Sequence, residues 1–150
     1  MKNLIDKFIV SRIMGLVGAT DNPGKFGYLA YRELKRRGYA VYPVNSSRET
    51  IGGDRCFHSV LELPSEVKNL LIVLPPVRTE KLIREIDPSA TEMVWMQNGA
   101  ESTEAVALCR EKGIDVIYRQ CILMHTRPVR SYHLLHRWWW LASGRQGMKE

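Results

Sequence analysis

The stretch Ile13–Gly27, reading I-M-G-L-V-G-A-T-D-N-P-G-K-F-G, constrains the fold of this chain more than any other. An apolar run of strand length, Ile13–Val17, meets Gly18, and small and polar residues follow before Gly27 opens an amphipathic segment. A buried strand, a tight loop and the first turn of a helix have this pattern. The start of a helix presents backbone N–H groups and the positive end of the helix dipole. The stretch therefore predicts an anion site, most often one for a phosphate.

The residues that follow complete a βαβ unit. Apolar side chains recur at helical spacing from Phe26 onward, and Gly38 is placed to end the helix. We expect the charged residues of this helix, including Glu33 and Arg37, to face away from the core. Tyr39–Val44 is then a second apolar strand.

The same alternation of strand and helix continues along the chain. Further apolar runs at Leu70–Leu74, Met93–Met96 and Ile114–Tyr118 indicate strands, and amphipathic segments separate them. Between residues 48 and 64, a turn at Gly52-Gly53 and a single helical turn at Leu61–Pro64 are expected. The pattern predicts an α/β fold, a doubly wound Rossmann-like parallel sheet of about five strands with helices on both faces.

Helices are also expected outside this core, at about residues 3–12 and about 129–142. The spacing of Asn98 and Glu101 predicts an N-cap and its reciprocal partner for the helix that ends at Gly113. At 150 residues the chain is most simply one domain, residues 1–150.

The composition says more about the cellular compartment than about the function. The formal net charge of +6 suits acidic small molecules, nucleic acid or an anionic surface about equally. The odd count of three cysteines, with no C-x-x-C pair, points to reduced thiols in a cytoplasm. The apolar residues near the N-terminus are interrupted by charges, which is unlike a signal peptide or a membrane span.

The first loop offers the candidate contacts to a phosphate. Gly18 permits a tight turn, Thr20 and Asn22 offer hydrogen bonds, and Lys25 adds a positive charge. The expected ligand-binding residues of this loop are Gly18, Ala19, Thr20, Asn22, Lys25, Phe26 and Gly27. An ordinary strand-to-helix turn with a solvated lysine is the alternative.

The second loop bears on the kind of nucleotide. NAD sites usually end their second strand in a carboxylate that accepts from the ribose 2′-hydroxyl, but this chain has Asn45, then Ser46, and Arg48 shortly after. A guanidinium can bind a phosphate carried by the ribose. The ligand is therefore expected to be coenzyme A (CoA), with its 3′-phosphate, or NADP, with its 2′-phosphate. A plain turn with a surface arginine is the alternative.

Four segments together resemble a known family: V-G-A-T-D-N-P-G-K-F-G, R-G-Y-A-V-Y-P-V-N, W-M-Q-N-G-A and the C-I after the fifth strand. They are similar to the small, single-domain CoA-binding proteins of Rossmann type. Those proteins are related to the CoA-binding domains of succinate–CoA ligase α subunits and of NDP-forming acyl-CoA synthetases. The resemblance spans about Ile13 to Ile122.

The resemblance implies a placement for CoA. The loop at Gly18–Gly27 would hold the diphosphate, and Asn45–Arg48 would lie by the phosphorylated adenosine. The remaining length of CoA would be flanked by Pro75, Pro76, Gln97, Asn98 and Gly99. Ser46 stands where the family commonly has proline.

The resemblance also bears on catalysis. The ligase relatives use a phosphorylated histidine carried on a second domain, which the sequence does not reach, so binding of CoA or acyl-CoA without catalysis is expected. Cys121 could form a mixed disulfide with the CoA thiol or pack as a core thiol. His58 and His125 suggest no catalytic role, and His133 with His136 lack further ligands at metal-binding spacing.

Two other functions remain open from the sequence. An NADP-binding reductase or redox-sensing module would use the same loops. A nucleic-acid or protein interaction module would use the basic, tryptophan-rich tail, where Trp139 and Trp140 lie off the apolar stripe of the expected helix. A homodimer contact through that helix is expected in preference to nucleic-acid binding.

Overall fold

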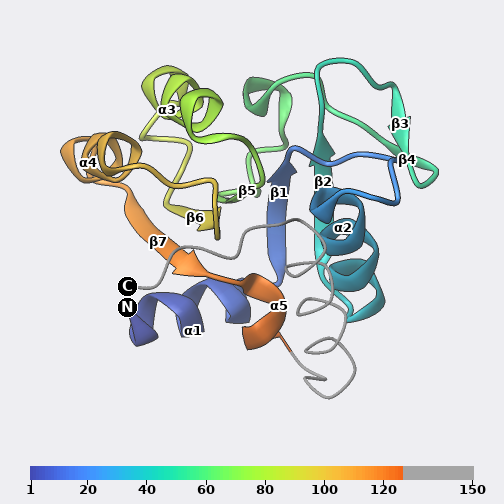
Figure 1. Ribbon diagram of the computed structural model, residues 1–150, viewed down its shortest axis with the longest axis horizontal. Helices are drawn as coiled ribbons and strands as arrows, with labels where there is room; N and C mark the ends of the chain where they lie inside the picture. The colour runs from blue at the N-terminus through green and yellow to red at the C-terminus, as the bar shows by residue number, and fades with distance from the viewer. Residues whose placement is uncertain (127–150) are drawn as a thin grey trace.

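A five-stranded parallel sheet forms the centre of the computed structural model, which describes residues 1–126 (Figure 1). Its strands follow the order β2-β1-β5-β6-β7. They span β1 (Ile13–Val17), β2 (Ala40–Val44), β5 (Asn69–Ile72), β6 (Met93–Gln97) and β7 (Asp115–Gln120). The chain leaves β1 toward β2 on one side and later returns to β5 on the other, so the strand order reverses beside β1. Ligands of doubly wound folds bind at such a reversal, outside the carboxyl ends of the strands.

Helices cover both faces of the sheet, as the sequence predicts (Figure 1). One core contains side chains of α1, α2 and α5, and the other contains side chains of α3 and α4. The helices are α1 (Lys2–Ser11), α2 (Phe26–Arg36), α3 (Pro76–Glu85), α4 (Thr103–Glu111) and α5 (Ile122–His125). The strands are buried on both sides, which explains their continuous apolar runs.

Trp95 of β6 is the largest fully buried side chain among residues 1–126 and lies under α1. Phe8 meets the indole edge-on with ring centroids 5.3 Å apart. The indole Nε1 donates to the carbonyl oxygen of Gln120 at 3.0 Å, which satisfies the one polar atom of the side chain. This pairing attaches the first helix of the chain to the far half of the sheet.

Two helices end at the glycines that the sequence indicates. Gly38 after α2 and Gly113 after α4 both have positive φ, at 86° and 72°. After α2, the N–H groups of Gly38 and Tyr39 donate to the carbonyls of Lys35 and Leu34. Gly113 and its successor make the same pair of hydrogen bonds after α4. This is the Schellman arrangement, which needs a left-handed residue and so favours glycine.

The N-cap expected at Asn98 is wrong. Helix α4 begins later, at Thr103, and the hydroxyl of Ser102 caps it by accepting from the N–H of Ala105 at 3.0 Å. Glu101 instead accepts from the N–H of Gly99 at 2.8 Å. The spacing of a capping box is present, but the loop after β6 uses its acidic residue to close a turn.

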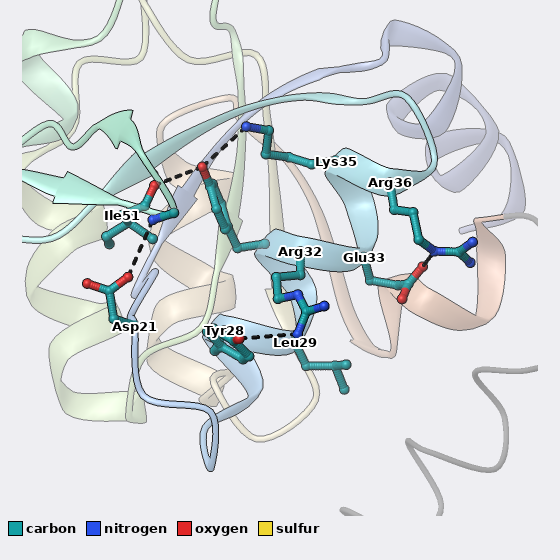
Figure 2. Close-up of a pocket in the computed structure, with 10 residues that line it drawn as sticks. Asp21, Tyr28, Leu29, Arg32, Glu33, Lys35, Arg36 and Ile51 are labelled. Carbon is teal, nitrogen blue, oxygen red and sulfur yellow. Dashed lines mark hydrogen bonds and ion pairs between the residues drawn. The ribbon is translucent and has the colours of Figure 1, made fainter.

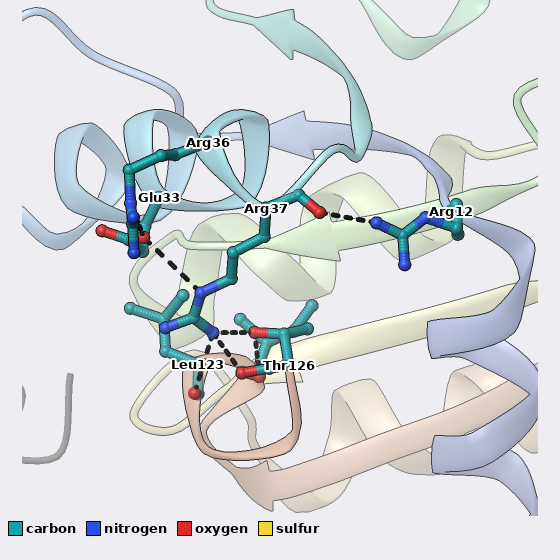
Figure 3. Close-up of polar contacts among 7 residues, drawn as sticks. Arg12, Glu33, Arg36, Arg37, Leu123 and Thr126 are labelled. Atoms are coloured by element: carbon teal, nitrogen blue, oxygen red, sulfur yellow. Dashed lines mark hydrogen bonds and ion pairs between the residues drawn. The ribbon is translucent and has the colours of Figure 1, made fainter. Parts of the chain in front are cut away.

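The expectation that Glu33 and Arg37 face solvent is also wrong (Figure 3). The Arg37 side chain is fully buried, and its Nη1 donates to the carbonyl of Leu123 at 3.1 Å and to both oxygens of Thr126. Glu33 lies 3.5 Å from its Nε. Burial lowers the pKa of Arg37, and the neighbouring Glu33 opposes that shift. The guanidinium thus fixes α5 against α2.

The segment between β2 and β5 carries more structure than the sequence indicates. A short hairpin joins β3 (Thr50–Ile51) to β4 (Asp54–Arg55), and the turn η1 spans Val60–Glu62, close to the single turn expected there. Val44 and Phe57 pair in a parallel bridge. The segment therefore extends the covering of the sheet beyond β2.

The C-terminal helix expected at residues 129–142, with His133, His136, Trp139 and Trp140, lies outside the described residues. Among residues 1–126, no helix is both long and apolar enough to cross a membrane.

Candidate functional site

A cleft of about 490 Å³ opens where the carboxyl ends of β1, β2 and β5 meet. It therefore lies at the reversal of strand order, the position that topology favours for a ligand. Six of the residues that the sequence predicts for the site line it: Gly18, Thr20, Lys25, Asn45, Ser46 and Pro75.

The two glycines of the first loop allow segments of backbone to approach one another. Gly18 has a φ of +95°, and a Cβ placed on it would lie 2.1 Å from the carbonyl oxygen of Val73. A Cβ on Gly27 would lie 2.2 Å from the carbonyl oxygen of Gly18. Both contacts are far too short for any side chain, so the start of α2 reaches its place in the cleft only with glycine at both positions.

The rest of the first loop is folded by its own side chains. Thr20 Oγ1 accepts from the N–H of Asn22 at 3.2 Å, and Asn22 Oδ1 accepts from the N–H of Gly24 at 3.0 Å. Lys25 is the N-cap of α2, and no side chain within residues 1–126 caps that helix. The start of α2 thus combines a lysine with the positive end of a helix dipole, a combination that stabilises an anion.

Asn45 connects the first and second loops. Its amide Nδ2 donates to the carbonyl of Ala19 at 2.8 Å, and its Oδ1 accepts from the N–H of Ser47 at 2.8 Å. Its backbone N–H donates to the carbonyl of Phe57. One side chain thereby holds the two loops that form one end of the cleft.

The other predicted site residues lie outside this cleft. Ala19, Phe26 and Gly27 are buried at the base of the first loop. Asn22, Arg48 and Pro76 are exposed on the same rim but do not line the cleft.

The loop after β6 also lies apart from the cleft. Gln97 is buried, and its Oε1 accepts from the N–H of Ile122 at 3.1 Å. Asn98 lines a separate hollow of about 650 Å³ with Ser102 and Arg119, and the neighbouring Gly99 closes the turn with Glu101.

The cleft also has lining residues that sequence reasoning missed. They come from the turn η1 and from α3: His58, Ser59, Val60, Leu61, Arg78, Lys81, Leu82 and Glu85. Those of α3 recur at helical spacing, so the sequence shows that they share a helix face, but not that this face points toward the cleft. Those around η1 lie in the segment without a periodic pattern and gave no such signal.

A larger hollow, of about 660 Å³, lies on the outer side of α2 against the β3–β4 hairpin (Figure 2). Tyr31 lines this hollow, and its hydroxyl donates to the carbonyl of Ile51 at 2.9 Å. The same hydroxyl contacts Asp54, which also contacts Lys35. Burial, followed by the hydrogen bond to Asp54, raises the pKa of Tyr31. The hydrogen bond from Lys35, and then that from Tyr31, lowers the pKa of Asp54. These contacts fix the hairpin to α2 and occupy the polar groups on that side.

The cysteines and histidines add no further reactive cluster within the described residues. Cys121, the N-cap residue of α5, is buried in the core, and burial raises the pKa of its thiol. No group of three or more His, Cys, Asp or Glu side chains in residues 1–126 could hold a metal ion. His58, at the cleft, contacts Glu49 at 3.1 Å, and His125 contacts Gln120.

Comparison with known proteins matches residues 12–127 to the model of the CoA binding domain family. The α subunit of ADP-forming acetate–CoA ligase II from Pyrococcus furiosus is 28% identical over 135 residues. That match covers 82% of this chain but 30% of the subunit, so the chain spans less than a third of that relative.

Solved structures agree with the fold. A conserved hypothetical protein from Pyrococcus furiosus superposes with a TM-score of 0.71 at 34% identity, covering 74% of this chain and 96% of that one. An acetyl-coenzyme A synthetase from Ca. Korarchaeum cryptofilum gives a TM-score of 0.65 at 25% identity, covering 78% and 27%. The NADP-binding reductase considered from the sequence has no support among these relatives.

Proposed function

The chain belongs to the CoA binding domain family, and from that premise we propose that it binds CoA or an acyl-CoA in the cleft at β1, β2 and β5, without catalysing a reaction. One observation carries the proposal. The cleft lies at the reversal of strand order and joins the start of α2, Lys25 and the Asn45 loop in one place. A diphosphate is the group that such a helix start and lysine would stabilise.

The remaining parts of CoA have partners of suitable chemistry. Val60, Leu61 and Leu74 provide apolar surface within the same cleft, and Leu61 is 73% exposed. An apolar side chain left open beside cations suits a ligand that combines a ring system with phosphates. The loop at Gln97–Gly99, at the carboxyl end of β6, is the proposed neighbour of the distal, thiol-bearing end.

Binding without catalysis rests on how the reactive side chains are used. His58 contacts a carboxylate, and the Ser59 hydroxyl caps η1 by accepting from the N–H of Leu61. The buried Cys121 is proposed as a core thiol and not as a partner of the CoA thiol. We propose further that residues 1–150 act as one binding domain. We also propose a homodimer contact through residues 129–142.

Thermal unfolding with CoA, dephospho-CoA, NADPH and NADH tests the ligand. A ligand that binds only the folded state stabilises it by about 2.7 kcal/mol at a hundred times its dissociation constant. CoA, as the proposed ligand, is therefore expected to raise the unfolding midpoint most. A rise with NADPH and none with CoA would refute the proposal.

A second experiment tests for catalysis. The chain is incubated with acetyl-CoA, and the free thiol is then titrated. Sustained release of CoA above a protein-free control would contradict the proposal that the chain does not catalyse a reaction.

A further inference from the structure

Three cations line the cleft without a partner among the described residues: Lys25, Arg78 and Lys81. Arg84, a basic residue just outside the cleft, is engaged differently. Arg84, on the same helix as Arg78, pairs with Glu104 of α4 at 3.0 Å. Glu85 is the only acidic side chain of residues 1–126 that lines the cleft. The cleft is therefore a place where positive charge has been left uncompensated.

Helix α3 directs one face toward this cleft. Lys81 and Leu82 lie three and four residues after Arg78, and Glu85 lies three residues after Leu82, so the four residues share one side of the helix. Leu82 packs against the apolar core beneath, while Arg78 and Lys81 are exposed. Each of the two cations can therefore bind an anion in the cleft without breaking an ion pair within the described residues.

The start of α3 is held in place. Pro75 and Pro76 begin the helix, a position that suits proline because its missing N–H would be unpaired there. The N–H groups of Arg78 and Thr79 both donate to the carbonyl of Pro75 at 3.0 Å. Arg78 therefore projects from a constrained first turn.

The positive charges come from two separate elements. Lys25 stands at the start of α2, and the pair Arg78 and Lys81 stands on α3, with both elements lining the same cleft of about 490 Å³. Apolar residues lie in the same cleft. A ligand with two anionic groups joined through a less polar ring fits this distribution of charge. The 3′-phosphorylated ADP part of CoA has that form.

We infer that Arg78 and Lys81 bind the 3′-phosphate on the ribose of CoA, so that α3 distinguishes CoA from dephospho-CoA. This inference rests on the proposed function. Arg48, which the sequence suggests for the ribose phosphate, is exposed outside the cleft lining. A guanidinium and an ammonium side by side can take a phosphate dianion, the guanidinium by two parallel hydrogen bonds.

The test compares dissociation constants for CoA and dephospho-CoA by titration calorimetry. The wild-type chain should bind CoA at least about tenfold more tightly, since a charge-assisted hydrogen bond contributes that much or more. The double variant Arg78→Gln, Lys81→Gln keeps side-chain length and removes both charges, and its ratio should fall to about one. Arg84→Gln, on the same helix but directed to α4, and Arg48→Gln should both keep the wild-type ratio.

Each other outcome is informative. An unchanged ratio in the double variant, or a ratio lost in Arg48→Gln alone, overturns the inference and leaves the proposed function intact. An equal loss of affinity for both ligands in the double variant would show that these cations bind the diphosphate, and it would also overturn the inference. Failure of the wild-type chain to bind CoA overturns both the inference and the proposed function. An unfolding midpoint within a degree or two of wild type confirms that the double variant is folded.

Discussion

Asn45 has two physical reasons to be an amide, and only one of them concerns a ligand. From the sequence, the missing carboxylate argues for a phosphorylated ribose. In the structure, the Nδ2 of this side chain donates to the carbonyl of Ala19 at 2.8 Å. An aspartate could accept from Ser47 but could not donate to that carbonyl, and the two oxygens would repel. The protein's own backbone thus requires the amide, so this residue identifies the ligand less strongly than its position in the motif suggests.

The three cysteines allow a prediction at the same scale. Burial raises the pKa of Cys109 to about 12 and also raises the pKa values of Cys56 and Cys121. Because the thiolate is the reactive form, iodoacetamide should leave the folded chain unmodified at pH 8 and add three groups after unfolding in guanidinium. Mass spectrometry measures both states.

The same shifts set a pH dependence of stability. A thiol whose pKa is raised on folding favours the folded state below its unfolded pKa, and this contribution is lost as pH rises through the interval up to the folded pKa. The free energy of unfolding should therefore decline above about pH 9, toward 12. Rapid labelling of Cys121 in the folded chain at pH 8 would instead contradict its place as a buried core thiol.

At the scale of elements, the strand, loop and helix at the start of the fold depend on two glycines. We expect Gly27→Ala to lower the free energy of unfolding by at least about 1–3 kcal/mol and to weaken CoA binding, since its Cβ would meet the Gly18 carbonyl oxygen at 2.2 Å. Gly24→Ala, in the same loop, is the matched control, because its Cβ would lie 3.3 Å from one side-chain oxygen. Denaturant unfolding and calorimetry measure the two effects. Equal stability of the two variants would contradict the packing assigned to the loop.

Elements fixed by local chemistry could be predicted from the sequence. The bounds of β1 and the helix ends at Gly38 and Gly113 follow from apolar runs and left-handed glycines close by in the chain. The burial of Arg37 could not, because its partners lie near residue 123 and nothing in α2 distinguishes it from exposed Arg36. The hairpin at β3 and β4 likewise depends on contacts to Tyr31 of α2.

The candidate site divides in the same way. Residues that directly follow a strand, such as Gly18 and Asn45, were predictable because parallel strands bring their carboxyl ends together. Arg78 and Lys81 line the cleft only because of the angle at which α3 packs beside the reversal of strand order. The local sequence does not encode that angle. The segment around His58 reaches the cleft through the long connection after β2.

The whole molecule carries a formal net charge of +6, and CoA is a polyanion. We expect the dissociation constant for CoA to rise at least about threefold between 50 and 500 mM NaCl, because salt screens charges separated by more than the Debye length, about 10 Å at 0.1 M. Calorimetry at several salt concentrations measures this. The unfolding midpoint of the ligand-free chain in the same salts separates an effect on binding from one on folding. A salt-independent constant would show that uncharged contacts dominate.

The guanidinium of Arg37 sets an order of events during synthesis. Its acceptor at Leu123 lies 86 residues further along the chain, so the ribosome releases α2 long before α5 exists. Until then the guanidinium lacks its acceptors in α5, although Glu33 on its own helix is already within reach. Final docking of the helix layer that contains α1, α2 and α5 therefore waits for the last described element to emerge. We expect partly synthesised chains to hold this face open to chaperones and proteases.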